Sequence, residues 1–287
     1  MTRNWGRWGA EDERGCLNLI DEAATLRGLA TAVRGESVSL GLPLGNGRGP
    51  AAALRPPVQH LFMRSGADYA AGLPERPGYG FADDLLILPC HGTTHLDALA
   101  HVWQDGLLYN GVSADTVTSR GAALSGIGTA GPIVTRGLFV DAAGPPGGAT
   151  GPVPVGIVEQ RLAAAGVRPL PGDALVVRTG WLRDWRAGAS SPDAWPGLDM
   201  DCLDWLDEHG IALVGADNIT VEVHPSSVAG SALPLHVALL RDRGMPLLEL
   251  LDLERLALTG VVEFLLVVSP LNLAGGSGSP VAPVAVL

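Results

Sequence analysis

Short apolar runs typical of β-strands recur along the chain, and they limit its possible folds more than any other feature. Strands are predicted at Ser37–Leu40, His60–Met63, Leu85–Cys90, Pro132–Val140, Ala174–Arg178, Ala212–Gly215 and Val261–Val268. Helices are predicted at Glu22–Val33, Gly156–Gly166, Met200–His209, Pro234–Arg243 and Asp252–Leu258. The second half of the chain alternates helix and strand, whereas the first half is mostly strand and loop. This order predicts an α/β or α+β fold with a mixed sheet.

The composition is that of a globular protein. Of the 287 residues, 47% are hydrophobic and 17% are charged, which supplies ample apolar material for a core and argues against disorder. The one linker-like segment, residues 144–156, lies between two apolar stretches, so we interpret it as a surface loop. We therefore expect a single domain over residues 1–287. We also expect Asp199 to cap the helix that follows it and Gly210 to end that helix.

Charge and cysteine content limit the partners and the compartment. The net charge of −11 argues against a nucleic-acid partner, and the absence of lysine excludes Schiff-base chemistry. Three scattered cysteines form neither a disulfide framework nor a Cys-x-x-Cys motif. The beginning of the chain lacks the apolar stretch of a signal peptide, and no apolar run approaches the roughly 20 residues that span a bilayer. We expect a soluble cytoplasmic protein with no membrane partner.

Four polar residues that suit metal chemistry, His91, His95, Asp97 and His101, lie close together in the sequence. On a helix, Asp97 and His101 would point away from the face shared by the other two, and a helical zinc motif would need glutamate in place of Gly92. In an extended chain, His91, His95 and Asp97 project to one side. Two imidazoles and one carboxylate suit zinc, manganese or iron and leave positions open for water and substrate. We predict that these three residues bind a metal and that His101 is a general acid or base.

Two further candidates lie far along the chain in apolar surroundings, His236 and Glu249. A buried charged group without a partner is costly, so each needs one. From the residues alone, a core histidine bonded to a backbone carbonyl competes with a ligand role for His236. His60 and His209 have structural explanations at a strand and at a helix end. His224 lies at the entry to a turn, where it could line the site.

The motif residues and their surroundings resemble a family of metal-dependent cyclases that includes bacterial kynurenine formamidase and isatin hydrolase. The similarity covers nearly the whole chain, through residues 8–9, 15–18, 105–111, 135–137, 171–173, 178–181, 215–218 and 275–280. The chain is most similar to the longer branch of that family, in which Asp-Ala-Leu-x-His and Tyr-Asn-Gly are typical. Leu99 stands where many formamidases have proline, which argues against kynurenine formamidase activity itself.

The resemblance implies a fold, a ligand set and an assembly. The fold is a swivelling β/β/α arrangement, in which a mixed sheet curls around the metal site and helices flank it. The first two motif histidines and the aspartate would bind a divalent ion, zinc or manganese, and His101 would be catalytic. In members with two ions, the residues that match His236 and Glu249 join the aspartate around the second ion. The family usually forms dimers or tetramers, so we expect a homodimer or homotetramer.

These features predict a metal-dependent hydrolase of a small cyclic or aromatic amide or ester, in which metal-bound hydroxide cleaves a C–N or C–O bond. Trp103, Tyr109 and Asn110, close to the motif, are expected to bind this small-molecule substrate. One alternative is an aromatic polyketide cyclase that uses the metal to stabilise an enolate during aldol ring closure. Another is a non-catalytic metal-stabilised binding protein, against which the open ligand set argues. The glycine-rich run at 275–280 is not followed by a helix, so a dinucleotide site is not expected.

Overall fold

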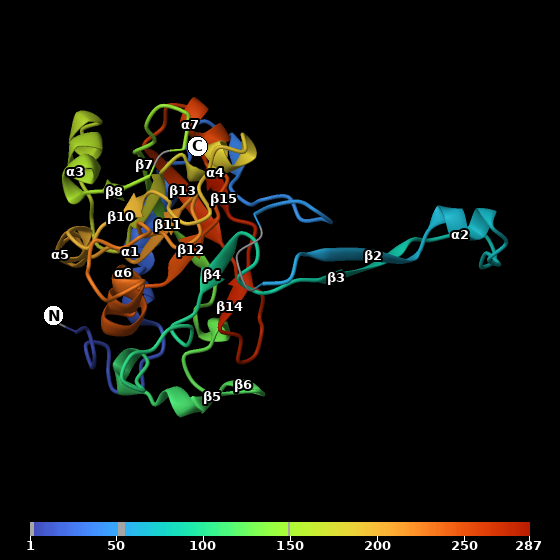
Figure 1. Ribbon diagram of the computed structural model, residues 1–287, viewed down its shortest axis with the longest axis horizontal. Helices are drawn as coiled ribbons and strands as arrows, with labels where there is room; N and C mark the ends of the chain where they lie inside the picture. Colours follow the sequence, from blue (N-terminus) through green and yellow to red (C-terminus); the bar gives the residue numbers. More distant parts are fainter. Residues whose placement is uncertain (1–2, 51–54, 149) are drawn as a thin grey trace.

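A curled mixed sheet forms the centre of the computed structural model, which describes residues 3–50, 55–148 and 150–287 (Figure 1). Within these residues the sheet has nine strands. Their order is β1 (Ser37–Ser39), β15 (Val284–Val286), β13 (Glu263–Val268), β7 (Ile133–Asp141), β9 (Ala174–Arg178), β11 (Leu213–Ala216), β12 (Leu247–Glu249), β4 (His95–Asp97) and β14 (Gly278–Pro280). The four central strands β7, β9, β11 and β12 are parallel, and the strands on both sides of them pair antiparallel.

Both faces of the central strands are buried, which explains why these strands read as continuous apolar runs. In β9, Leu175 and Val177 belong to one hydrophobic cluster, whereas Ala174 and Val176 belong to a second cluster. Because successive side chains of a strand alternate between its faces, the two clusters lie on opposite sides of the sheet. The predicted strand at Ala174–Arg178 is therefore found at the same residues.

Helices cover both faces of the sheet. They are α1 (Glu22–Leu29), α3 (Val155–Ala164), α4 (Trp181–Arg186), α5 (Cys202–Glu208), α6 (Pro234–Val237) and α7 (Glu254–Leu258). Residues of α3, α5 and α6 pack into the cluster that contains Leu175, whereas α7 packs into the cluster that contains Val176. A π-helical segment, η5 (Ala238–Arg243), continues α6. Short 3-10 turns are also present among the described residues, at Gly15–Leu19, Tyr109–Gly111, Ala114–Thr116 and Ile127–Thr129.

In the part of the chain that the structure describes, three small two-stranded sheets lie outside the main sheet. Strands β8 (Pro152–Val153) and β10 (Gly197–Leu198) pair parallel, and β5 (Val117–Thr118) and β6 (Gly121–Ala122) pair antiparallel. The third sheet joins β2 (Gln59–Arg64) and β3 (Asp83–Ile87), with α2 (Gly66–Ala70) between them. This hairpin, which we call the arm, projects away from the rest of the molecule (Figure 1).

The predicted fold class is confirmed, because the structure has a curled mixed sheet flanked by helices. One local prediction is wrong: Asp199 does not cap a helix. Helix α5 begins at Cys202, and its N-cap residue is Asp201. The side chain of Asp199 instead accepts a hydrogen bond from Ser227 Oγ. Gly210 does follow the end of the helix, with a positive φ of 64°. In the described parts of the chain, no helix is long and apolar enough to cross a membrane.

Candidate metal centre

Strand β4 carries the centre of the predicted motif. His95 and Asp97 lie on this three-residue strand and are 0% and 1% exposed. As predicted from the sequence, alternation along an extended strand brings both side chains to one face. His91 and His101 differ from the expectation of one continuous extended segment, because they lie in turns on either side of β4. These turns fold back toward the strand, so the imidazole rings of His91 and His101 stack with centroids 4.0 Å apart.

Asp97 is the central residue of the cluster. Its Oδ1 atom lies 2.7 Å from His91 Nδ1, 3.3 Å from His95 Nε2 and 4.0 Å from His101 Nε2. Its Oδ2 atom lies 3.4 Å from His236 Nε2. One carboxylate therefore faces four imidazole rings.

The structure also brings His236 and Glu249 to this carboxylate from distant parts of the chain. Glu249 ends β12, which pairs with β4 so that Glu249 lies opposite His95. Its Oε2 atom is 3.3 Å from His95 Nε2, and its Oε1 atom is 3.6 Å from His236 Nε2. His236 lies on α6 and is 4% exposed, and Glu249 is 2% exposed. Each of these isolated polar residues thus finds its partners within the same cluster.

In both His95 and His236, a hydrogen bond to a backbone carbonyl determines which of the two ring nitrogens faces the cluster. His95 Nδ1 lies 2.7 Å from the carbonyl oxygen of Thr93, and His236 Nδ1 lies 3.1 Å from that of Thr220. A carbonyl oxygen only accepts hydrogen bonds, so both Nδ1 atoms must carry hydrogen and donate. In the neutral rings, both Nε2 lone pairs then point toward the carboxylates. Histidines that bind metals are oriented in this way.

The cluster leaves buried polar atoms unsatisfied. Among the described residues, His95 Nε2, Asp97 Oδ2 and Glu249 Oε1 are buried and have no well-directed hydrogen bond. Buried polar atoms are rarely left in this state unless a water molecule, a ligand or an ion completes them. Converging lone pairs of two imidazoles and two carboxylates suit a divalent cation. The residues present therefore fit the metal that the sequence predicts.

The carboxylates of the cluster attract cations, protons included. Burial alone would lower the pKa of His95, but the contacts and charges of Asp97 and Glu249 outweigh burial and raise its pKa to about 10. The pKa of His236 rises to about 9 against burial, through Asp97 and Glu249. Burial would raise the pKa of Asp97, but the charge of His101 and contacts with the other histidines hold it well below its usual range. Protons and a metal cation would compete for these lone pairs.

The potential ligand atoms fall into two overlapping groups. One group contains His91, Asp97 and His101, and the other contains His95, Asp97 and Glu249. Within each group the ligand atoms lie within 4.8 Å of one another. Asp97 belongs to both groups, so it would be a ligand whichever group held a cation.

Two residues not predicted from the sequence support the cluster, Gly278 at the start of β14 and Ser277 just before it. This strand pairs with β4, so Gly278 lies opposite Asp97. Ser277 Oγ lies 3.0 Å from His91 Nε2. A Cβ atom at Gly278 would lie 2.5 Å from Cε1 of His91, so only glycine fits against this ring. The resemblance did include residues 275–280, but only the strand register reveals their role.

We expect the substitution Gly278→Ala to displace His91. The added methyl group would overlap the imidazole ring, and overpacking of this kind costs about 1–3 kcal/mol. The free energy of unfolding should fall by that amount, and bound metal per chain should decrease. Gly156→Ala is a suitable control, because Gly156 lies in α3 with nothing within 4 Å of the new methyl group. Equal stability and equal metal content in both variants would contradict this packing argument.

Glu222 is a buried carboxylate that holds His236 in place. It accepts hydrogen bonds from the backbone N–H groups of Leu235 and His236, and its Oε1 atom lies 3.6 Å from His236 Nδ1. Burial raises the pKa of Glu222 to about 7. His224, which the sequence places at the entry to a turn, stacks on the ring of Trp195 with centroids 4.3 Å apart.

The three predicted substrate-binding residues differ in their surroundings. Tyr109 is 0% exposed, and its hydroxyl donates a hydrogen bond to Asp12. The side-chain amide of Asn110 donates to the backbone of residues 9, 10 and 12 and accepts from Gly6. These contacts give Tyr109 and Asn110 a structural role in holding the N-terminal segment. Trp103 is 51% exposed. The role of all three residues in substrate binding stays a prediction.

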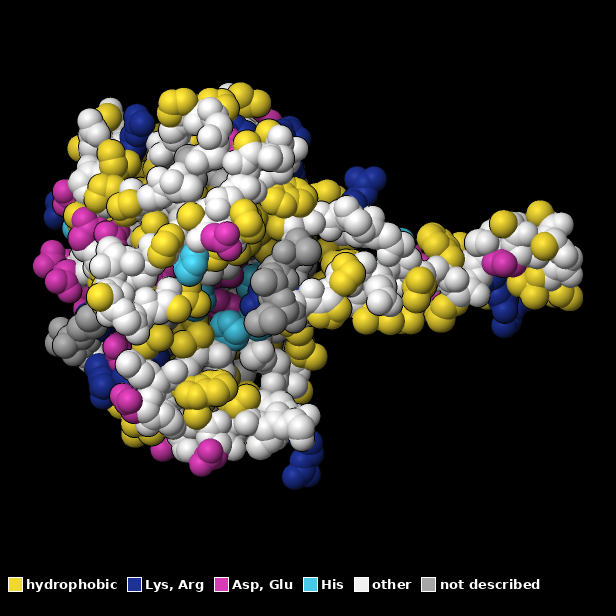
Figure 2. Space-filling model, viewed as in Figure 1, with side chains coloured by type: hydrophobic (Ala, Val, Ile, Leu, Met, Phe, Trp, Pro, Cys, Tyr) yellow, Lys and Arg dark blue, Asp and Glu magenta, His cyan; other side chains and the backbone are white. Residues whose placement is uncertain are grey.

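The cluster is accessible from one side of the molecule. His101 is the least buried member, with 24% of its side chain exposed. Figure 2 shows histidine and acidic side chains in a hollow of the body, next to the point where the arm departs. A small molecule could therefore reach the His101 side of the cluster.

Comparisons with known proteins agree with this fold. A family model described as Putative cyclase matches residues 38–223, and the chain belongs to this family. No curated protein matches the chain. A crystal structure described as a novel cyclase is similar over 100% of this chain and 98% of its own, with 34% identity and a TM-score of 0.91.

Two isatin hydrolases share the fold at lower identity. One, bound to the product analogue thioisatinate, is 21% identical, with a TM-score of 0.64 over 93% of this chain and 99% of its own. The other, from Ralstonia solanacearum, is 22% identical, with a TM-score of 0.62 over 92% of this chain and 95% of its own. The similarity to the isatin hydrolases is one of fold, whereas the family model and the structure at 34% identity are both described as cyclases.

Proposed function

We propose that this protein is a metal-dependent hydrolase that cleaves a C–N or C–O bond in a small cyclic or aromatic amide or ester. The observation that carries the proposal is the convergence of His95, His236, Asp97 and Glu249 with buried atoms left unsatisfied. Such a donor set suits one or two zinc or manganese ions. The fold shared with isatin hydrolases supports the substrate class.

A divalent cation bound by these residues would lower the pKa of water and polarise a carbonyl oxygen. The residues of the chain supply the other requirements of the reaction. Burial and the neighbouring histidines lower the pKa of His101 to about 4, despite the opposing charge of Asp97. Its imidazole is therefore neutral near pH 7 and can accept a proton from the water molecule that adds to the carbonyl carbon. The same group can return this proton to the departing nitrogen or oxygen atom.

Ring closure of an aromatic polyketide is the second candidate function. The crystal structure described as a novel cyclase, at 34% identity, supports it. In this reaction His101 would remove a proton next to a carbonyl group, and a divalent cation held by the same residues would supply the positive charge that stabilises an enolate. Hydrolysis and ring closure differ in their products, because hydrolysis adds water whereas ring closure followed by dehydration loses water.

The proposal is tested by incubating the metal-loaded protein with aryl formamides, cyclic imides, lactones, isatin and polyketide intermediates. Mass spectrometry should show a product 18 Da heavier than a cyclic substrate, or two fragments from an acyclic substrate, as the addition of water requires. A product that has lost water with its carbon skeleton intact would favour the cyclase instead. The His101→Asn variant serves as a control for reactions that do not need the site.

A further inference from the structure

A strained segment of the backbone contacts His236. Val221, within residues 218–222, has a φ of 61°, which lies in the left-handed region. A β-branched residue rarely adopts this conformation, and Val221 is also fully buried. Such a conformation persists only where the surrounding structure enforces it, and residues of this kind are concentrated at functional sites. Residues 218–222, which we call the bracing segment, therefore require contacts that hold them in this shape.

Hydrogen bonds from two side chains hold the bracing segment. The side-chain oxygen of Asn218, a fully buried residue, accepts a hydrogen bond from the backbone N–H of Val221 at 2.7 Å, and its amide donates to the carbonyl oxygen of Glu222. The hydroxyl of Thr220 donates to the same carbonyl oxygen at 2.8 Å and accepts a hydrogen bond from Trp195 Nε1. The segment is therefore fixed, although it is part of no helix or strand.

Two oxygen-bearing groups of the bracing segment hold His236. The carbonyl oxygen of Thr220 accepts a hydrogen bond from the ring at Nδ1, at 3.1 Å. The carboxylate of Glu222 accepts hydrogen bonds from the backbone N–H groups of Leu235 and His236, at 3.1 and 2.7 Å. These N–H groups are the first two of α6, because Pro234 begins the helix and has none. Such groups have no partner within their own helix, so the carboxylate supplies one.

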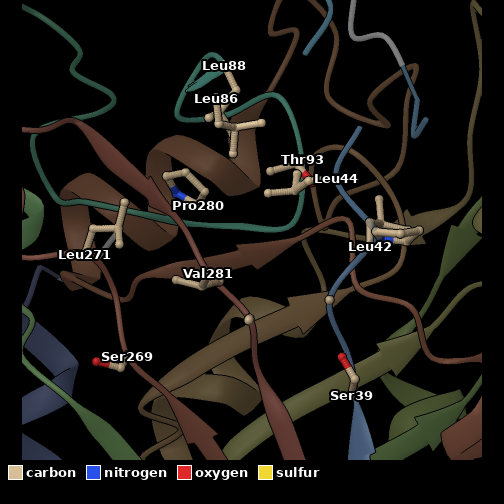
Figure 3. A pocket seen from close by; sticks show the side chains of 13 residues that line it. Ser39, Leu42, Leu44, Leu86, Leu88, Thr93, Ser269, Leu271, Pro280 and Val281 are labelled. Carbon is tan, nitrogen blue, oxygen red and sulfur yellow. The ribbon is translucent and has the colours of Figure 1, made fainter. Parts of the chain in front are cut away.

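His95 is held in a different way. It lies on β4, which pairs with β12 on one side and with β14 on the other. Its Nδ1 atom contacts the carbonyl oxygen of Thr93. Only the backbone of Thr93 makes this contact, since its side chain lines an apolar cavity of about 640 Å³ at the root of the arm (Figure 3). The sheet therefore positions His95, whereas the position of His236 depends on an irregular segment.

Two separate contacts with the bracing segment determine where the free ring nitrogen of His236 lies. This Nε2 atom is 3.4 Å from Asp97 Oδ2 and 3.6 Å from Glu249 Oε1. The bond to Thr220 sets the rotation of the ring, and the bonds to Glu222 set the position of the backbone that carries it. We propose that Thr220 and Glu222 are positioning residues that fix His236 at the metal centre and thereby set how tightly the protein holds a divalent cation. This inference rests on the metal centre of the proposed function, but not on the reaction.

Transfer of zinc from the zinc-loaded protein to a chelator of known affinity tests the proposal. The Thr220→Val variant keeps the carbonyl oxygen but loses the hydroxyl hydrogen bonds that hold it in place. The Glu222→Gln variant keeps only one acceptor oxygen for two N–H groups. We expect each variant to hold zinc about 10–100-fold more weakly than the native protein, as loss of residues that orient metal ligands typically does. Thr220→Ser, which keeps the hydroxyl group, should retain the native affinity.

Two matched controls separate positioning from general destabilisation. Thr135→Val removes the hydroxyl of another buried threonine, which lies on β7 and donates to the carbonyl oxygen of Gly172. Asp184→Asn neutralises another buried carboxylate that accepts a hydrogen bond from a backbone N–H group, that of Gly148. Both variants should lower the free energy of unfolding and leave the zinc affinity per folded chain at the native value. Denaturant unfolding, followed by circular dichroism, measures the stability of every variant.

The possible outcomes distinguish the positioning role from the metal centre itself. Native zinc affinity in folded Thr220→Val and Glu222→Gln would overturn the proposal, because the two residues would then serve the fold alone. Equal weakening in the two controls would also overturn it, because zinc affinity would then follow stability. A native protein that holds no divalent cation would contradict the metal centre, and with it both the proposed function and this inference.

Discussion

The Asp97→Ala variant is expected to lose nearly all bound metal. Asp97 contacts four histidines and belongs to both groups of potential ligand atoms, so no other residue can replace it. Loss of a residue that only orients a metal ligand typically costs 10–100-fold in affinity, so we expect loss of this ligand to cost more than about 100-fold. Elemental analysis of the purified protein measures the effect directly. Catalytic activity should disappear together with the metal.

Loss of metal must be distinguished from loss of the fold. Asp217 provides a matched control, because it is also a fully buried carboxylate but accepts hydrogen bonds from Thr179 and Gly180. Asp217→Ala should lower the free energy of unfolding and leave the metal content per folded chain unchanged. Circular dichroism reports the folded fraction of both variants. If folded Asp97→Ala held the native amount of metal, the assignment of the metal centre would be wrong.

The His101→Asn variant is expected to keep its metal and to lose turnover by roughly 10²–10⁴-fold, as removal of a general acid–base group typically does. Asparagine is similar in size but cannot accept and return a proton at neutral pH. His101 has the most exposed side chain of the cluster histidines, which places it where a substrate arrives. Kinetics on the identified substrate, combined with elemental analysis, measure both effects.

His209→Asn is the control for this experiment, because His209 lies at the end of α5 and contacts the carbonyl oxygen of Trp205. It should leave both metal content and turnover unchanged. Near-normal kcat in a metal-replete His101→Asn variant would exclude the catalytic role. Joint loss of metal and activity would make His101 a ligand, which its place in the group with His91 and Asp97 allows.

The sequence predicts a part of the fold correctly where the local residue pattern and the tertiary environment favour the same secondary structure. Strand β9 is correct at both ends, because its apolar run is buried on both faces and is bounded by turn residues. The helix at 234–243 is found as α6 followed by a π-helical segment, a change of hydrogen bonding that side-chain periodicity does not reveal. Apolar residues 61–63 and 85–87 predict strands, but they do not reveal that these strands leave the body as an exposed arm.

In the candidate site, too, the positions of some residues follow from the local sequence, whereas others depend on contacts between distant parts of the chain. His95 and Asp97 lie on one strand, so their common face follows from alternation alone. His91 and His101 reach the cluster through turns, which strand alternation does not describe. His236 and Glu249 meet the motif only because β12 pairs with β4 and α6 approaches it, so the resemblance identified them and local spacing did not. Ser277 depends on the register of β14 in the same way.

A crystal structure of the metal-loaded protein, with anomalous diffraction recorded above and below the absorption edge of the metal, tests the central claim most directly. We predict an anomalous peak between Asp97, His95 and Glu249, and the two overlapping ligand groups allow a second peak beside His91. The Asp97→Ala crystal should lack these peaks. Anomalous density elsewhere on the protein, with the buried atoms of this cluster satisfied by water or by one another, would contradict the account.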